Sequence, residues 1–212
     1  MPHLTSELNG RTIRGKVHIE THPNGEIDVL NEIAAAMPDG ANASSILNEL
    51  RPRLIKALGQ DKDMHEQDTA ISMEGMDIAF MVLDRASSRI DYAGAYRPLW
   101  IMRGGQLIQY RPDRMPIGRY VGPDRDFTNH EIAIEEGDII YMFSDGITDQ
   151  MGYIDDKRTE IGHFSQKRFA DLVAKVGTLT LSEQKTRIET AVEAWRNGYR
   201  QLDDILMIGL KI

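Results

Sequence analysis

The spacing of hydrophobic residues in the first third of the chain predicts helices. Residues 26–37, EIDVLNEIAAAM, and residues 44–59, SSILNELRPRLIKALG, place apolar side chains three and four positions apart. That spacing puts them on one face of a helix. Ser44 or Ser45 is expected to cap the second helix and Gly59 to end it. Two amphipathic helices are therefore expected before the first long strand.

From residue 76 onward the pattern becomes that of strands. The first apolar run, MDIAFMVLD, is hydrophobic at most positions, as in a strand buried on both faces. Helical spacing returns only near residues 165–176 and 181–199. The predicted strands are 76–84, 90–96, 98–103, 106–110, two within 130–146, and 204–212. This order predicts an α+β domain, a meander of about seven strands with helices before and after it.

Charge and composition exclude several classes of function. The 212-residue chain has a formal net charge of −8, which disfavours non-specific binding to a nucleic-acid backbone. It has no cysteine, so it forms neither disulfides nor thiolate metal sites. No apolar run approaches the roughly 18 residues of a membrane span. We expect a cytoplasmic protein that binds neither nucleic acid nor membrane.

Two acidic motifs lie where apolar strands meet loops. In YMFSDGITDQ (141–150), Asp145 and Gly146 follow a strand, and Asp203 and Asp204 begin the last one. Asp-Gly is also an ordinary turn pair. Carboxylates are, however, the ligands that Mg²⁺ and Mn²⁺ prefer. The two motifs could share a cation if their strands are neighbours, which spacing alone does not establish, so both interpretations stay open.

A histidine pair gives a weaker alternative. His18 and His22 have the i, i+4 spacing of a helical zinc pair, with Glu20 between them. Residues 16–21, KVHIET, alternate like a strand instead, and no third ligand is evident. A zinc site is therefore not favoured.

Several segments, taken in order, resemble a known family. They are GMDIAFMVLD, IDYAGAYRPLWIMRGGQLIQY, MPIG, FTNHEIAIEEGDIIYMFSDGITDQ, FADLVAKV and QLDDILMIGLKI. Together they resemble the C-terminal two-thirds of the bacterial SpoIIE-like phosphatase domain, a branch of the metal-dependent PPM protein phosphatases. The versions in sensor and two-component regulator proteins are the most similar. The resemblance covers residues 26–212 and leaves residues 1–25 as an unassigned N-terminal segment.

This resemblance implies a fold, an activity and site residues. The fold would be an antiparallel β-sandwich flanked by helices. The family hydrolyses phosphoserine and phosphothreonine, often on anti-sigma-factor antagonist proteins, with two Mn²⁺ or Mg²⁺ ions that activate a water. Asp145 and Asp203 inherit the role of metal ligands. Gly146, Asp149 and Asp204 inherit supporting roles, with Gly146 expected to let the backbone turn sharply.

The sequence also departs from the family. The N-terminal GGD…D and D-x-[ST]-G-H-G motifs, whose aspartates bridge the metals in the family, are not found before Glu26. The resemblance therefore implies missing N-terminal strands and a weak, incomplete metal site. Two functions stay open: a phosphatase whose missing motifs come from elsewhere, and a non-catalytic module that binds a signalling partner. The exposed sheet would be covered by residues 11–22 as a substitute strand or by a second copy of the chain.

Overall fold

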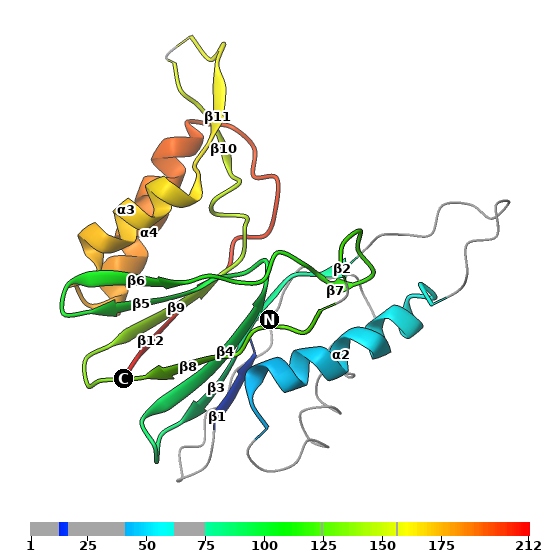
Figure 1. Ribbon diagram of the computed structural model, residues 1–212. Helices are drawn as coiled ribbons and strands as arrows, with labels where there is room; N and C mark the ends of the chain where they lie inside the picture. The colour runs from blue at the N-terminus through cyan, green and yellow to red at the C-terminus, as the bar shows by residue number, and fades with distance from the viewer. Residues whose placement is uncertain (1–12, 17–40, 62–74, 124, 156) are drawn as a thin grey trace, which may run out of the picture.

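The computed structural model describes residues 13–16, 41–61, 75–123, 125–155 and 157–212. In these ranges the chain forms two four-stranded antiparallel sheets with helices on their outer faces (Figure 1). The predicted α+β class and the helix-flanked antiparallel sandwich are therefore confirmed.

All seven predicted strands lie in the two large sheets. The first sheet has the order β1 (Ile13–Lys16), β3 (Ile78–Asp84), β4 (Arg89–Ala95) and β8 (His130–Ala133). The second has the order β12 (Met207–Lys211), β9 (Ile139–Phe143), β5 (Leu99–Arg103) and β6 (Gln106–Tyr110). Two small pairs were not predicted: β2 (Gly75–Met76) with β7 (Ile117–Gly118), and β10 (Met151–Tyr153) with β11 (Ile161–His163).

The continuous apolar runs arise because the central strands are covered on both faces. Along β3, Ile78 and Phe80 pack in a cluster with helix α2 (Ala43–Ala57), whereas Met81 and Leu83 pack between the two sheets. The outer face of the second sheet packs against α3 (Gln166–Val176) and α4 (Leu181–Arg196). The layers are thus helix, sheet, sheet and helix (Figure 1).

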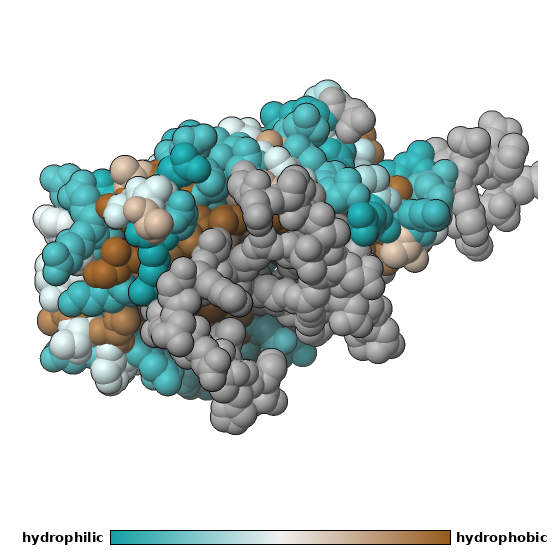
Figure 2. Space-filling view, turned by 90° about the horizontal axis from the view of Figure 1, so that it is seen from below, coloured by the Kyte–Doolittle hydropathy of each residue, from teal (hydrophilic) through white to brown (hydrophobic). Residues whose placement is uncertain are grey.

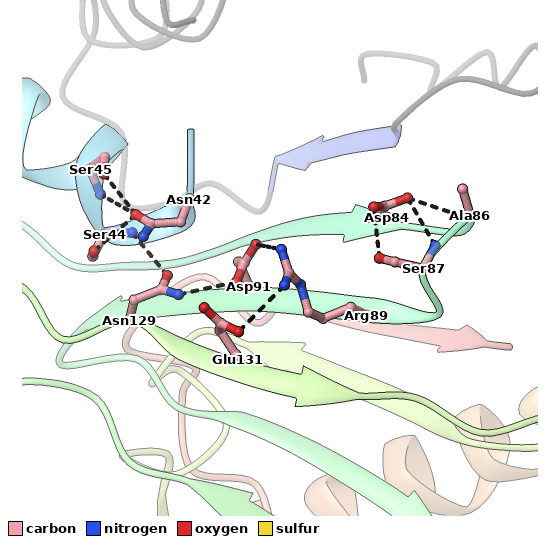
Figure 3. A network of polar contacts seen from close by, with 10 residues as sticks. All are labelled: Asn42, Ser44, Ser45, Asp84, Ala86, Ser87, Arg89, Asp91, Asn129 and Glu131. Carbon is pink, nitrogen blue, oxygen red and sulfur yellow. Dashed lines mark hydrogen bonds and ion pairs between the residues drawn. The ribbon is translucent and has the colours of Figure 1, made fainter. Parts of the chain in front are cut away.

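The structure corrects several predicted element ends. The cap of α2 is Asn42, not Ser44 or Ser45, and the Asn42 carboxamide oxygen accepts a hydrogen bond from the Ser45 amide at 2.9 Å (Figure 3). Helix α4 ends at Arg196 rather than at residue 199, because Asn197 adopts a left-handed conformation with φ 47°. Strand β12 begins at Met207, three residues later than predicted.

The N-terminal strand supports part of the substitute-strand expectation. Residues Ile13–Lys16 pair antiparallel with β3, placing Ile13 opposite Leu83 and Lys16 opposite Phe80. This strand ends where the predicted strand 16–21 would begin. The rest of that segment, the predicted helix 26–37 and the three residues of the zinc alternative lie outside the described residues.

Some apolar surface remains exposed next to the sandwich. Leu202, Ile205 and Leu206, which precede β12, are among the exposed large apolar side chains. In the view from below (Figure 2), hydrophobic residues are visible at the surface between hydrophilic ones. In the described ranges, no helix is long and apolar enough to cross a bilayer.

Candidate functional site

The two acidic motifs lie against each other because β9 and β12 are antiparallel neighbours. Phe143 at the end of β9 is opposite Met207 at the start of β12. Beyond this pair, the Ser144 amide donates to the Leu206 carbonyl at 3.0 Å, and the Leu206 amide donates to Ser144 Oγ at 3.0 Å. Ser144 Oγ in turn donates to the Asp204 carbonyl at 2.8 Å. The side chain of Ser144 therefore joins the loop after β9 to the segment before β12.

Gly146 makes this junction possible by lacking a side chain. A Cβ at this position would lie 2.3 Å from the carbonyl oxygen of Asp204, far inside van der Waals contact. Gly146 lies within the turn of residues 145–148, but its φ is not positive, so the turn conformation by itself does not require a glycine. The structure requires glycine for the close approach of two backbones.

Asp145 begins the turn that follows β9 and carries an unsatisfied oxygen. Its carbonyl accepts from the Asp149 amide at 2.8 Å and from Thr148 Oγ1 at 3.1 Å. Its carboxylate Oδ2 accepts from Arg97 Nη2, while Oδ1 is buried without a hydrogen-bond partner. Among the described residues three buried side-chain polar atoms lack a partner, and only Asp145 Oδ1 belongs to a charged group. A buried, unpaired carboxylate oxygen is a position that a cation would satisfy.

One guanidinium nitrogen lies between two carboxylates at this site. Arg97 Nη2 donates to Asp145 Oδ2 and also to Asp77 Oδ2, the latter at 2.6 Å. Burial raises the pKa of the Asp77 carboxyl above its ordinary value of 3.8; Arg97 opposes this rise, and the charge of Asp145 adds to it. The site thus has two carboxylates and one resident cation.

The AGAYRPL segment fixes the backbone of Arg97. Tyr96 has a positive φ of 55°, and the Arg97 amide donates to the Ala95 carbonyl at 2.7 Å, which closes a tight turn after β4. The buried hydroxyl of Tyr92 donates to the Arg97 carbonyl at 2.6 Å. Gly94 leaves room for both, because a Cβ there would lie 2.2 Å from the Tyr92 hydroxyl and 2.4 Å from the Arg97 carbonyl oxygen. Burial also raises the pKa of Tyr92 well above 10, which keeps its proton in place.

The other predicted site residues lie nearby but turn to local partners. Asp203 is exposed, and its Oδ1 accepts from the Asp204 amide at 2.7 Å. Asp204 joins the junction through its backbone carbonyl. Asp149 is exposed, and its Oδ1 accepts from Thr148 Oγ1 at 3.3 Å. The structure therefore brings together the backbones of the SDG motif (Ser144–Gly146) and the DD motif (Asp203–Asp204), whereas the carboxylates of Asp149 and Asp203 keep local partners.

The described residues offer a cation a partial site. In the ranges that the structure covers, no three carboxylate or imidazole groups gather closely enough to hold a metal ion. The unsatisfied oxygen of Asp145 fits a cation, and Asp203 could supply a second carboxylate if it turned from its own backbone. Together they fit one weakly held ion with most ligands from water, because Mg²⁺ needs about six oxygens.

Sequence reasoning missed Asp77 and Arg97 as site residues. Both stand in segments that carry the family resemblance, GMDIAFMVLD and AGAYRPL. The signal that could have found them is the short connection between predicted strands 76–84 and 90–96, because residues before the first strand and after the second lie at the same end of a hairpin. The pairing of those strands, with Ile78 opposite Ala95, places them together.

Comparison with solved structures identifies the class of fold. The chain resembles the SiaA-PP2C domain of Pseudomonas aeruginosa with 21% sequence identity and a TM-score of 0.72, covering 88% of this chain and 67% of that chain. It resembles the manganese-presoaked phosphatase domain of the cell fate determinant SpoIIE from Bacillus subtilis with 15% identity and a TM-score of 0.51, covering 92% of this chain and 76% of that chain. It also resembles a structure of RsbU and RsbW domains from Mycobacterium tuberculosis with 16% identity and a TM-score of 0.59, covering 88% of this chain and 45% of that chain. The fold is that of PP2C-type phosphatase domains.

The family follows from the sequence itself. The profile of the family described as Stage II sporulation protein E (SpoIIE) matches residues 27–212. The chain therefore belongs to the SpoIIE family, as its motifs predicted. Comparison with curated protein sequences finds no significant match.

Proposed function

We propose that this chain is a metal-dependent phosphoprotein phosphatase domain of bacterial signalling, in which Asp145 and Asp203 hold Mn²⁺ or Mg²⁺. The observation that carries the proposal is the buried, unpaired Oδ1 of Asp145 beside the hydrogen-bonded junction of the two acidic motifs. When bound, the metal would supply Lewis-acid activation of the attacking water. Ser144 and Gly146 keep the two ligand-bearing loops together, and Gly146 allows their backbones to touch.

The substrate we propose is a phosphoserine or phosphothreonine on a regulatory protein of the anti-sigma-factor antagonist type, in the cytoplasm. Membership of the SpoIIE family supports this class of substrate. The domain would comprise residues 26–212, incomplete at its N-terminal side, with residues 1–25 as a separate segment. The M. tuberculosis match covers 45% of a chain that carries both RsbU and RsbW domains, which supports an association with other signalling modules.

A second function, a non-catalytic module that binds a signalling partner, is favoured by a different observation. The Asp145 carboxylate already has a cationic partner, Arg97, and Asp203 is turned to its own backbone. With no three-ligand group in the described ranges, this part of the chain lacks the ligands of a two-metal centre. We therefore expect little or no phosphatase activity from this chain alone.

Two measurements test the proposal. Calorimetric titration with Mn²⁺ should show binding no tighter than about the high-micromolar range, lost in Asp145→Asn. The matched control is Asp84→Asn, which removes the same charge at the end of β3, where the carboxylate accepts from Ala86 and Ser87 of the following turn (Figure 3). Binding that survives Asp145→Asn unchanged would remove Asp145 as a ligand.

Turnover of a phosphoserine peptide separates the two functions. The assay uses excess Mn²⁺ at neutral pH, where catalysis depends on a positioned, activated water. Robust turnover that Asp203→Asn abolishes would establish the phosphatase and show that other residues complete the site. No turnover, together with Mn²⁺ binding at Asp145, would favour the binding module.

A further inference from the structure

We propose that Arg97 is an internal counter-cation that holds the Asp145 carboxylate while no metal is bound and competes with the metal for it. This inference rests on the proposed function, because it concerns the affinity of the same site. It assigns a positioning role to a residue outside the two acidic motifs.

The geometry of the contact points to competition. Asp77 Oδ2 and Asp145 Oδ2 accept from the same nitrogen, Nη2 of Arg97. That nitrogen therefore lies between two carboxylate oxygens, as a hard cation would. A cation at the unpaired Oδ1 of Asp145 would draw on the same carboxylate charge that Arg97 already neutralises through Oδ2.

Burial makes this competition strong enough to measure. The side chains of Arg97, Asp145 and Asp77 are 17%, 19% and 26% exposed, so most of their surface is shielded from water. Ion pairs of this kind interact more strongly than exposed pairs, which salt and hydration weaken. The positive charge of Arg97 also repels an incoming divalent ion.

The surroundings of Arg97 allow it to release Asp145 without leaving the site. Its backbone is held by the Tyr92 hydroxyl and by the turn at Tyr96. When Asp145 turns to a metal, Arg97 retains Asp77 as its partner at 2.6 Å. Arg97 therefore keeps a counter-charge when it releases Asp145. A buried guanidinium without a counter-charge would destabilise the fold. Asp77 makes the exchange possible by stabilising the released arginine.

The test compares Mn²⁺ affinity across a series of variants of the full chain. Arg97→Gln removes the charge, and Arg97→Lys keeps it on an ammonium group whose position and donors differ from those of Nη2. Arg89→Gln is the matched control: Arg89 begins β4 and pairs with Asp91 and Glu131 (Figure 3), whereas Arg97 follows the opposite end of that strand. It changes the net charge by the same amount.

We expect Arg97→Gln to bind Mn²⁺ about tenfold more tightly than the wild type, which corresponds to about 1.4 kcal/mol. Arg97→Lys should bind about threefold more tightly, and Arg89→Gln should match the wild type. Unfolding in EDTA should show a lower midpoint for Arg97→Gln, and Mn²⁺ should raise that midpoint more than in the wild type.

Two outcomes would overturn the inference. One is an Arg97→Gln variant that binds Mn²⁺ no more tightly than the wild type while Asp145→Asn abolishes binding. The other is equal tightening in Arg89→Gln, which would show an effect of net charge alone. If Arg97→Gln does not fold, unchanged or weaker Mn²⁺ binding by Arg97→Lys overturns it equally. Binding that ignores Asp145→Asn is a different result, because it refutes the proposed metal site itself.

Discussion

Replacing Gly146 with alanine should separate the two acidic motifs and destabilise the domain. The added Cβ would lie 2.3 Å from the Asp204 carbonyl oxygen and 2.8 Å from its carbonyl carbon. Neither atom can rotate away, because both belong to the backbone that Ser144 Oγ holds through its 2.8 Å bond. Overpacking of this kind costs about 1–3 kcal/mol.

Equilibrium unfolding in urea gives the assay. For an m-value of about 2 kcal/mol per molar, a loss of about 2 kcal/mol lowers the midpoint by about 1 M. The control is Gly162→Ala, whose Cβ would meet no atom closer than 3.5 Å. Because alanine restricts the unfolded chain more than glycine does, this control should be neutral or slightly stabilised.

The same variant tests the junction as part of the site. If the loops separate, Asp145 and Asp203 cannot approach one ion, so Mn²⁺ binding should weaken with stability. A Gly146→Ala variant within about 0.5 kcal/mol of the wild type, with unchanged Mn²⁺ affinity, would refute the reasoning. It would mean that the close backbone approach is not needed in solution.

Three further predictions concern the two sheets. Asp138→Asn should cost about 2–3 kcal/mol in urea at pH 7, because this buried carboxylate binds Arg103 through two bonds of 2.9 and 2.6 Å. Burial raises the pKa of the Asp138 carboxyl, but the hydrogen bonds from Arg103 and the Glu135 amide outweigh burial and hold the pKa below 3.8. The stabilisation by this carboxylate is therefore complete above pH 3.8 and is lost as the pH falls through the folded-state pKa. At that low pH the stabilities of the wild type and the variant should converge. Tyr92→Phe should cost about 1 kcal/mol by removing the bond to the Arg97 carbonyl, and an unchanged urea midpoint would contradict this. Sedimentation velocity across concentrations should show a dimer, because β12 is an edge strand among the described residues and its unpaired backbone groups can pair with a second copy. A clean monomer whose residues 13–16 are protected from hydrogen exchange would instead favour β1 as the substitute strand.

The sandwich could be predicted because its main strands are long and apolar. All five residues of β9 are buried, and β3 alternates between two apolar clusters, so both runs are hydrophobic at nearly every position. Periodicity could not find the small sheets, since two or three residues contain no period. The β10 strand is placed by packing instead: a Cβ on Gly152 would lie 2.1 Å from the Trp195 carbonyl oxygen on α4.

The sequence predicted the two acidic motifs of the candidate site separately, but not that they lie together. Asp145 and Asp203 were found because each stands where an apolar strand meets a loop. Their proximity depends on β9 and β12 being neighbours, a long-range pairing that spacing does not encode. The contact between Asp77 and Arg97 depends on the register of the β3–β4 hairpin, which the short turn between the two strands sets. Strand pairing, rather than local sequence, decides which charges meet.

The junction also changes what the two motifs mean for function. Ser144 and Gly146 act through a hydroxyl and an absent side chain, and Asp204 acts through its backbone carbonyl. None of these contacts needs a metal, so packing between β9 and β12 is enough to require serine and glycine in the SDG motif. The carboxylates of these motifs make other contacts: Asp145 pairs with Arg97, and Asp203 accepts from the Asp204 amide. The motifs alone therefore establish the fold, and the chemistry depends on whether a metal ion can replace Arg97 at Asp145.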